Sequence, residues 1–244
     1  MCETCGCGDP HLVSVDVQER VLSENDRQAV HNREHFAAAG VTVLNLMGSP
    51  GAGKTAVLEA TARRLGGRRQ LGAIAGDLAT DHDAARLERA GVPARSISTG
   101  SACHLDAAMV HRALHHMNWS GLDYLFIENV GNLVCPAVYD LGEHANVVAL
   151  SVTEGEDKPL KYPVMFKKVD LVLLTKVDLL PHLPGISVDR IWDALQHVMP
   201  GPRMLRLSAT TGEGIDEWVG WLEERRAGRL GSTSPPPPRP SGLR

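Results

Sequence analysis

The chain has 244 residues, of which 43% are hydrophobic and 22% are charged, a balance typical of a globular protein with one sizeable core. The formal net charge of −4 and the sequence pI of about 6.2 exclude a globally basic surface of the kind that binds nucleic acid. The sequence has no apolar run long enough to span a membrane and no secretory signal pattern, so we expect neither a membrane partner nor export, and a cytoplasmic location.

Strand and helix patterns alternate along most of the chain. A charged helix is expected at 16–39, closed by Gly40, and a buried strand follows at 41–48. Further strands are expected at 71–77, 94–99, 122–131, 145–155, 170–178 and 204–209, and helices at 55–65, 84–91, 104–117, 187–199 and from 214 onward. This alternation predicts a three-layer α/β fold, in which helices cover both faces of a mostly parallel sheet.

The composition divides the chain into three parts. Residues 1–14 are expected to form a flexible N-terminal tether, because Gly6, Gly8 and Pro10 break regular structure. Residues 15–227 are expected to form one α/β domain. Residues 228–244 are rich in proline, glycine and serine, which predicts a disordered tail.

The segment GSPGAGKT at 48–55 matches the pattern G-x-x-x-x-G-K-[ST] and lies between a predicted strand and a predicted helix. In such a loop the backbone N–H groups and the helix N-terminus bind phosphate. Lys54 is expected to reach the β- and γ-phosphates, and Thr55 to bind Mg²⁺. The nucleotide-binding residues expected here are Gly48, Gly51, Ala52, Gly53, Lys54, Thr55 and Ala56.

The base is predicted from TKVD at 175–178, which resembles the guanine motif N-K-x-D with Thr175 where asparagine is usual. The Asp178 carboxylate can accept two hydrogen bonds from guanine that adenine cannot supply, and Lys176 can lie along the base. Ser208 and Ala209, in LSA at 207–209, occupy the position of the loop that completes a guanine pocket. The sequence therefore predicts GTP as the nucleotide. Together with the phosphate loop, it predicts a three-layer P-loop NTPase fold and a P-loop GTPase domain at 15–227.

Acidic residues follow two of the buried strands. Glu128 and Gly131 lie in ENVGN, where a P-loop protein carries an acidic residue and a glycine that senses the γ-phosphate. Asp77 ends another strand and is expected to bind Mg²⁺ or to orient the attacking water. Asp81 and Asp83 follow in DLATDHD, where metal ligation and helix capping are both open. The catalytic set we expect is Lys54, Asp77 and Glu128, and the Mg²⁺ ligands are Thr55 and Asp77.

The five cysteines form two groups, and their odd number in a cytosolic setting favours metal binding over disulfides. The first group is Cys2, Cys5 and Cys7, which we interpret as an N-terminal Ni²⁺ site. In the second group, Cys103 and His104 in SACHLDA and Cys135 in NLVCP are expected to converge at the carboxyl edge of the sheet. Two thiolates and an imidazole suit Ni²⁺ or Zn²⁺.

Four further histidines lie on helical faces. His111 and His115 follow His104 on one face of a predicted helix, and His31 and His35 lie on the first helix. We interpret all four as solvated helix residues. An extended metal-binding surface at His111 and His115 is the alternative.

Together the motifs CxxCGC, GSPGAGKT, SACHLDA, ENVGNLVCP, VTEGEDKPLKYP and TKVDLLP resemble the HypB family, nickel-inserting GTPases of [NiFe]-hydrogenase maturation. The resemblance covers residues 41–225 and the N-terminal cysteines. It implies a GTP-dependent homodimer of the SIMIBI class, with a shared metal site at the dimer interface built from Cys103, His104 and Cys135. It also implies delivery of nickel to the hydrogenase large subunit precursor with a HypA-type nickel chaperone, and it places the segment of Lys158 and Lys161 near the nucleotide.

Two enzyme alternatives remain open at this point. A small-molecule kinase would use the same phosphate loop, but it would need neither TKVD nor the cysteines. The urease nickel GTPase is similar in fold and phosphate loop, but its metal motif reads Cys-Pro-His where this chain has CHLDA. A metal-storage protein, a third class, would need many more ligands than this chain offers.

Overall fold

The sheet at the centre of the protein has seven strands in the order β3-β2-β4-β1-β5-β6-β7. The structure is a computed structural model and describes residues 15–77, 80–100 and 102–231, so Cys2, Cys5, Cys7 and residues 232–244 lie outside the described part. All six neighbouring strand pairs are parallel, which confirms the predicted fold class. The strands are β1 Thr42–Met47, β2 Leu71–Asp77, β3 Ala94–Ser98, β4 Tyr124–Glu128, β5 Ala145–Ser151, β6 Leu171–Thr175 and β7 Met204–Arg206.

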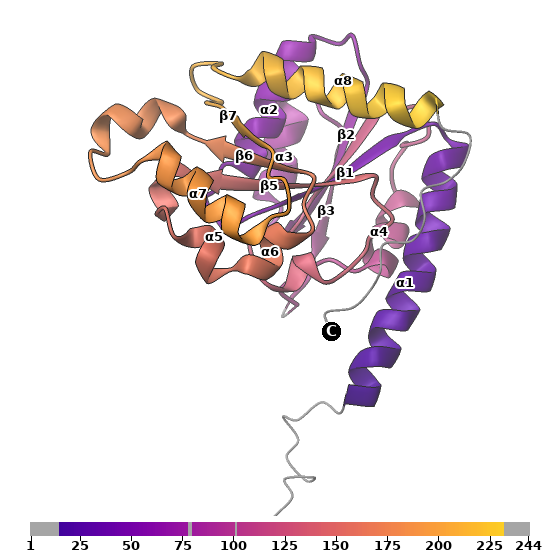
Figure 1. Cartoon of the computed structure of the whole chain (residues 1–244). Coiled ribbons are helices and arrows are strands. Elements are labelled where there is room, and N and C mark those ends of the chain that lie inside the picture. Colours follow the sequence, from indigo (N-terminus) through magenta and orange to yellow (C-terminus); the bar gives the residue numbers. More distant parts are fainter. Residues whose placement is uncertain (1–14, 78–79, 101, 232–244) are drawn as a thin grey trace, which may run out of the picture.

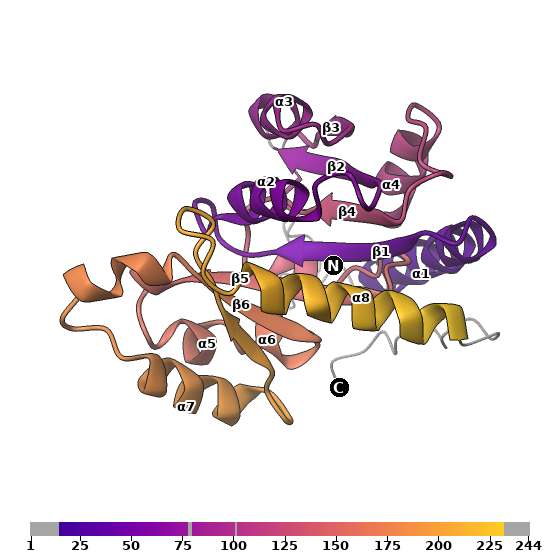
Figure 2. The same cartoon turned by 90° about the horizontal axis from the view of Figure 1, so that it is seen from above.

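Helices lie on both sides of this sheet (Figures 1 and 2). The α-helices are α1 Val15–Ala38, α2 Lys54–Leu65, α3 His82–Arg89, α4 Ala107–Leu114, α5 Lys158–Lys161, α6 Pro163–Lys167, α7 Val188–Val198 and α8 Ile215–Gly231. Three short 3₁₀ helices are η1 Cys135–Ala137, η2 Val152–Glu154 and η3 Val177–His182. Of the helices described, none is long and apolar enough to cross a membrane.

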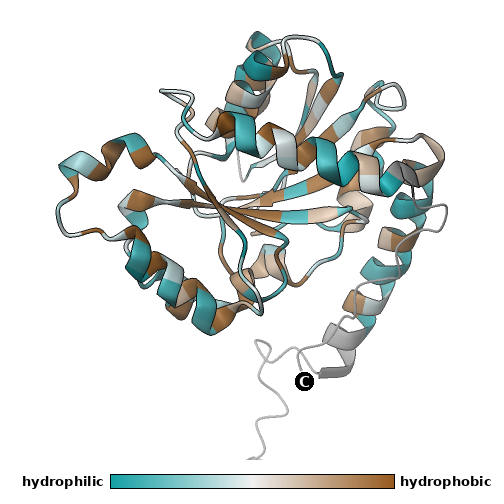
Figure 3. Cartoon of the chain, turned by 45° about the horizontal axis from the view of Figure 1, so that its top comes forward, coloured by the Kyte–Doolittle hydropathy of each residue, from teal (hydrophilic) through white to brown (hydrophobic). Residues whose placement is uncertain are grey.

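The core has two layers because side chains alternate between the two faces of each strand. Leu44 of β1 packs with Leu58 of α2 and Trp218 of α8 on one face. Val43, its neighbour, packs with Phe36 of α1 on the other face, where α4 also lies. The helices α6 and α7 cover β5 and β6 on that second face. The strands accordingly carry the densest apolar colour in Figure 3, while the outer faces of the helices are polar.

Several elements are shorter than the sequence predicts, and for two of them the structure shows a local reason. The helix predicted at 104–117 begins only at Ala107, because the Asp106 side chain caps it by accepting a hydrogen bond from the Met109 N–H at 2.6 Å. The strand predicted at 170–178 ends at Thr175, because Lys176 adopts a left-handed backbone with φ of 60°. The predicted strand at 145–155 likewise ends at Ser151.

The last helix is longer than predicted. Helix α8 continues to Gly231, so residues 228–231 are helical and the tail that we predicted from residue 228 begins too early. The apolar pattern of the helix ends before residues 228–231, but the backbone stays helical through them. The parallel strands direct their carboxyl ends to one edge of the sheet, where the loops with the predicted site residues follow.

Candidate nucleotide and metal sites

The phosphate loop connects β1 to α2 and depends on glycine backbone conformations. Gly48, Gly51 and Gly53 have φ of 142°, 74° and 93°, values that residues with a side chain rarely adopt. A side chain at Gly48 would also collide with the carbonyl oxygen of Ala149 at the end of β5. The loop therefore curves closely against the sheet, as the sequence pattern predicts.

Lys54, the first residue of α2, lies inside this loop and is only 7% exposed. Its Nζ is 3.3 Å from the carbonyl oxygen of Gly48 and 3.2 Å from that of Ser49. Burial lowers the pKa of Lys54, and the carboxylates of Glu128 and Asp83 oppose this shift. The Ser49 hydroxyl is buried and has no hydrogen-bond partner. A phosphate group would supply acceptors for both side chains.

A cavity of about 430 Å³ lies between the phosphate loop and the carboxyl ends of β2 and β4. Its walls include the loop glycines Gly51 and Gly53 and the acidic side chains of Asp77, Asp83 and Glu128. The remaining predicted nucleotide residues that line it are Lys54, Thr55, Ala56 and Gly131. The structure thus brings together most of the residues that we predicted from separate motifs.

The Thr55 hydroxyl lies between two carboxylates in this cavity. Its Oγ1 is 2.7 Å from Oε1 of Glu128 and 2.9 Å from Oδ1 of Asp83. The second oxygen of Glu128 is buried without a partner, and burial raises the pKa of Glu128 to about 7, against the lowering effects of Lys54 and Thr55. Three converging oxygens and an orphaned carboxylate oxygen fit a hard divalent cation such as Mg²⁺.

Asp83 contacts the Thr55 hydroxyl, whereas we predicted Asp77 as the carboxylate that binds Mg²⁺ together with Thr55. Asp77 lines the same cavity and accepts a hydrogen bond from the Thr80 hydroxyl. Asp81 occupies the N-cap of α3 without a side-chain capping bond, and Asp83 lies in the first turn of that helix. The sequence left the role of Asp83 open, because its contact with Thr55 depends on how α3 packs against α2.

The segment after β4 lies directly against the phosphate loop. A side chain at Gly131 would place its Cβ 2.7 Å from Cγ of Pro50 and 2.8 Å from its backbone nitrogen. The next residue, Asn132, forms an antiparallel bridge with Gly48. Only glycine fits at position 131 without displacing the loop.

The TKVD segment crosses the other side of the phosphate loop. The Thr175 hydroxyl donates to the carbonyl oxygen of Ala52 at 2.6 Å, and Nζ of Lys176 donates to that of Gly51 at 2.7 Å. Threonine at position 175 therefore holds the end of β6 against the loop. Lys176 is extended across the loop, in line with the predicted position along a base.

The LSA segment lies beside TKVD at the end of β7. The Val177 N–H donates to the carbonyl oxygen of Leu207 at 3.3 Å, and buried Ser208 accepts hydrogen bonds from the N–H groups of Thr210 and Thr211. Asp178 lies in η3 and Ala209 follows Ser208. The structure brings these predicted base-binding residues to one end of the sheet.

Cys103, His104 and Cys135 converge as predicted, and we call them the Cys/His cluster. Their ligand atoms all lie within 4.8 Å of one another, and both cysteines are free thiols. The Sγ atoms are 2.7 Å apart, and Nδ1 of His104 is 3.9 Å from Sγ of Cys103. The His104 ring stacks on Tyr139 with centroids 3.9 Å apart.

The ionisation of the Cys/His cluster suits metal capture. Burial lowers the pKa of His104, which favours the neutral imidazole that can bind a metal ion. Burial and the contact with Cys103 raise the pKa of the Cys135 thiol to about 11. A bound divalent ion would displace the thiol protons, so metal binding is expected to release protons.

Two asparagines connect the Cys/His cluster to the nucleotide side. Buried Asn129 follows Glu128, and its Oδ1 accepts the N–H of Leu105 at 3.2 Å, next to His104. Its Nδ2 donates to Oδ1 of Asn45 in the middle of β1 at 3.2 Å. The sequence patterns did not predict the roles of Asn129 and Asn132. A polar residue, Asn45, within the apolar run VLNLM could have indicated a buried hydrogen bond between strands.

Asn132 provides the second connection. Its backbone pairs with Gly48, and its Nδ2 lies 4.0 Å from Sγ of Cys135. Its Oδ1 accepts the N–H of Val134 at 2.8 Å, which holds the turn that carries Cys135. A displacement of the phosphate loop therefore acts on a residue that contacts the cluster.

Known proteins resemble this chain over most of its length. A family model described as CobW/HypB/UreG, nucleotide-binding domain, matches residues 42–205. The hydrogenase maturation factor HypB of Azotobacter chroococcum mcd 1 is 53% identical over 218 residues, spanning 88% of this chain and 70% of the relative. The HypB of Escherichia coli strain K12 is 49% identical over 212 residues, 87% of this chain and 73% of the relative.

The chain belongs to the HypB family. The crystal structure of HypB from Helicobacter pylori in complex with nickel is similar, with a TM-score of 0.81 at 38% identity, over 86% of this chain and 99% of that one. HypB from Archaeoglobus fulgidus has a TM-score of 0.78 at 40% identity, over 84% and 100% of the two chains. Membership confirms the resemblance read from the motifs.

Lys158 and Lys161, which that resemblance places near the nucleotide, lie on the short helix α5. Lys158 pairs with Glu154 at 3.3 Å, and Lys161 pairs with Asp157 at 2.7 Å. Neither is among the residues that line the phosphate cavity.

Proposed function

We propose that this chain is a GTP-hydrolysing nickel metallochaperone that delivers nickel to the large subunit precursor of a [NiFe]-hydrogenase during its maturation. The observation that carries the proposal is the connection of the Cys/His cluster to the phosphate loop through Asn129 and Asn132. The family supports the maturation role, and the nickel complex of the Helicobacter pylori relative supports the cargo.

Different residues around the phosphate loop bind the guanine base and hydrolyse the nucleotide. Asp178 accepts the guanine N–H groups, with Lys176, Ser208 and Ala209 around the base. Lys54 neutralises charge on the transferred phosphoryl group, and the N–H of Gly131 contacts the γ-phosphate. Thr55 and the carboxylates of Asp83 and Glu128 would hold Mg²⁺, which would supply neutralisation of phosphate charge when bound. Asp77 orients the attacking water.

Nickel is the cargo and passes through the Cys/His cluster. The cysteines Cys2, Cys5 and Cys7 receive Ni²⁺ first, and a HypA-type nickel chaperone assists the transfer to the hydrogenase precursor. Zn²⁺ competes for the same thiolates and imidazole. The protein acts in the cytoplasm as a homodimer that forms with GTP. Val134, which is 50% exposed beside Cys135, offers an apolar contact for the second copy.

The test compares nucleotides first and metal affinity second. A panel of GTP, ATP, CTP and UTP should give tight binding and hydrolysis of GTP alone, whereas preference for ATP would favour the kinase alternative. Ni²⁺ affinity is then measured with a GTP analogue and with GDP, on the wild type, Cys103→Ala/Cys135→Ala and Cys2→Ala/Cys5→Ala/Cys7→Ala.

The expected difference between the two nucleotide states is about 5- to 150-fold, the usual range of coupling between two sites. The variant that lacks Cys103 and Cys135 should lose this difference, and the N-terminal variant should keep it. Equal affinities in both nucleotide states, with an unchanged monomer–dimer balance, would overturn the proposal.

A second receiving protein is favoured by the names of two relatives. The Helicobacter hepaticus and Helicobacter pylori relatives, 42% and 38% identical, are named hydrogenase/urease maturation factor HypB. The nickel-loaded chain can be offered to both apo-enzymes. Activation of the hydrogenase alone supports the first proposal, and activation of urease assigns a second recipient.

A further inference from the structure

Four histidines gather where α1 packs on α4, and we call them the histidine cluster. His31 and His35 come from α1, His111 comes from α4, and His115 is the C-cap residue of α4. Each pair is four residues apart on one helical face. The rings of His31 and His35 have centroids 4.3 Å apart, and His31 and His111 are 5.1 Å apart across the two helices. His35 and His111 are 5.7 Å apart, and His111 and His115 are 4.8 Å apart.

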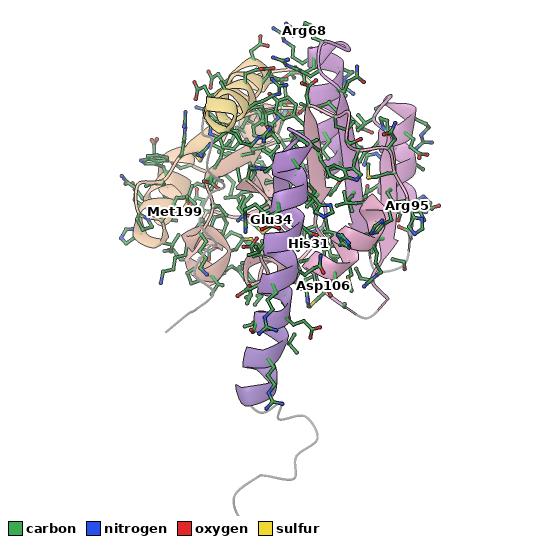
Figure 4. All side chains as sticks on the ribbon, turned by 90° about the vertical axis from the view of Figure 1, so that its right-hand side faces the viewer. His31, Glu34, Arg68, Arg95, Asp106 and Met199 are labelled. Carbon is green, nitrogen blue, oxygen red and sulfur yellow. The ribbon has the colours of Figure 1, made fainter. Side chains whose placement is uncertain are left out.

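Buried contacts fix the position of α1 against α4. Asn32, fully buried, donates from Nδ2 to the carbonyl oxygen of Ala107 at 2.9 Å, and Asn25 accepts the Ala107 N–H at 2.9 Å. Phe36, one residue after His35, is fully buried in the core. Figure 4 shows α1 running along this side of the molecule with His31 labelled on it. The four rings therefore meet because the helix packing places them together.

One half of a metal site is already present on α4. The Nε2 atoms of His111 and His115 are 3.2 Å apart. Two imidazole nitrogens bound to one tetrahedral ion at ordinary bond lengths are separated by about 3.3 Å. Pairs of histidines four residues apart on a helix are a recurring way to present two ligands to one ion.

The other half lies on α1 and can complete the site. His31 and His35 are exposed, so their rings are free to turn toward the α4 pair. Among the residues that the structure describes, three ligand atoms converge within 4.8 Å only in the Cys/His cluster, so such a rotation is required here. Imidazole in its neutral form is the metal ligand. Burial, followed by the charges of the other three rings, lowers the pKa of His111 and favours that form.

The geometry points to a separate all-histidine site, formed by His111 and His115 with His31 and His35, that binds one divalent transition-metal ion such as Ni²⁺ or Zn²⁺ and joins α1 to α4. Imidazole ligands suit ions of this class, whereas Mg²⁺ and Ca²⁺ prefer oxygen. The site goes beyond the proposed function, because it uses no ligand of the Cys/His cluster and no N-terminal cysteine. Its affinity is lower than that of the thiolate sites, since two rings must first be ordered.

The test uses Ni²⁺ alone, and in parallel Zn²⁺ alone, in calorimetric titrations of the full chain with all five cysteines changed to serine. We expect about one ion per chain, bound independently of chain concentration. His31→Gln/His35→Gln and His111→Gln should each weaken binding at least about tenfold. His116→Gln changes the exposed histidine next to the cluster and is the matched control, which should bind as the parent does.

A second measurement does not depend on the serine variant folding. In the wild-type chain, His31→Gln/His35→Gln should bind one ion fewer, and added Zn²⁺ should slow amide hydrogen exchange in α1 of the wild type but not of this variant. No loss of stoichiometry in the variant, or an affinity that rises with chain concentration, would overturn the site. If His111→Gln weakens Ni²⁺ binding but His31→Gln/His35→Gln does not, the ion is bound by His111 and His115 alone. That result would also overturn the proposal.

Discussion

The phosphate cavity and the Cys/His cluster lie at the same edge of the sheet, but they are built differently. The cavity is formed by backbone and by buried charges, with Lys54 and Glu128 only 7% and 3% exposed. The cluster consists of three half-buried side chains in the loops that follow β3 and β4. The first site is rigid because its backbone is packed against strands, and the second can change geometry when its loops shift.

This difference suggests a division of labour between the two sites. A ligand can shift a conformational equilibrium only by the difference in its interactions with the two states. The cavity offers strong interactions to a γ-phosphate, and the cluster offers a metal geometry that a small loop movement can alter. Substitutions in the cavity, in the cluster and between them should therefore have different effects on GTP hydrolysis, stability and Ni²⁺ binding.

Lys54→Met should disable the cavity and leave the cluster intact. Methionine fills the space of the lysine stem but cannot neutralise phosphate, so hydrolysis of GTP should fall about 10²- to 10³-fold. Ni²⁺ affinity of the nucleotide-free chain should stay the same, because the cluster contains no atom of the phosphate loop. Single-turnover hydrolysis and a metal competition assay measure the two properties. A parallel loss of nickel binding would mean that the two sites are one structural unit.

Glu128→Gln tests whether the burial of a carboxyl group in the phosphate cavity costs the protein stability at neutral pH. Burial raises the pKa of Glu128 from its ordinary value of 4.5 to about 7, so the folded wild type binds a proton that the unfolded chain releases between these values. The wild type should therefore lose stability as the pH rises from about 4.5 to about 7, by at most about 3 kcal/mol. Glutamine does not ionise, so the variant should avoid this loss.

Urea unfolding of the Mg²⁺-free, nucleotide-free proteins at pH 5 and pH 8 measures the effect. The variant should exceed the wild type in stability at pH 8, and the two should be closer at pH 5. Asp83→Asn is a useful comparison, since its carboxylate also contacts Thr55 but is considerably more exposed. An equal pH dependence in wild type and Glu128→Gln would show that Glu128 is not the buried group that we infer.

The same contrast explains what the sequence could predict. The phosphate loop is contiguous, and its glycine pattern describes a backbone shape, so GSPGAGKT predicted both the fold class and the loop. The Cys/His cluster joins two distant segments, and its prediction depended on the rule that parallel strands end at one edge.

Features that depend on helix packing were harder to predict. Asp83 was ranked below Asp77, because only the position of α3 over α2 brings it to Thr55. The meeting of His31 with His111 was missed, because nothing in a helical pattern says which faces of α1 and α4 will touch. Asn129 was missed because its role is a buried hydrogen bond to another strand.

Cys135→Ser should break the cluster and leave the cavity intact. Loss of one thiolate from three ligands should weaken Ni²⁺ binding at this site about 10- to 100-fold or more. Basal GTP hydrolysis should be unchanged, because Cys135 does not line the phosphate cavity. Cys7→Ser is the matched control, since it removes a thiol from the other predicted site. Slower hydrolysis without metal in Cys135→Ser would contradict the separation of the two sites.

Asn132→Ala should leave both sites working and weaken the connection between them. Asn132 pairs through its backbone with Gly48, and its side chain contacts Cys135 and holds the N–H of Val134. Alanine keeps the backbone pairing and removes both side-chain contacts. The ratio of Ni²⁺ affinities in the GTP-analogue and GDP states should therefore shrink, by about 0.5–2 kcal/mol or roughly 2- to 30-fold.

The connection is supported if this ratio changes while basal GTP hydrolysis and the Ni²⁺ affinity of the nucleotide-free chain stay nearly the same. Asn118→Ala, which removes an exposed asparagine between α4 and the start of β4, controls for the loss of an amide at the opposite edge of the sheet. Because coupling is reciprocal, the same variant should also show a smaller effect of Ni²⁺ on GTP affinity, by the same factor. If the ratio stays at its wild-type value, the connection runs through the buried contacts of Asn129 with Asn45 and Leu105, and the loop at Asn132 only follows it.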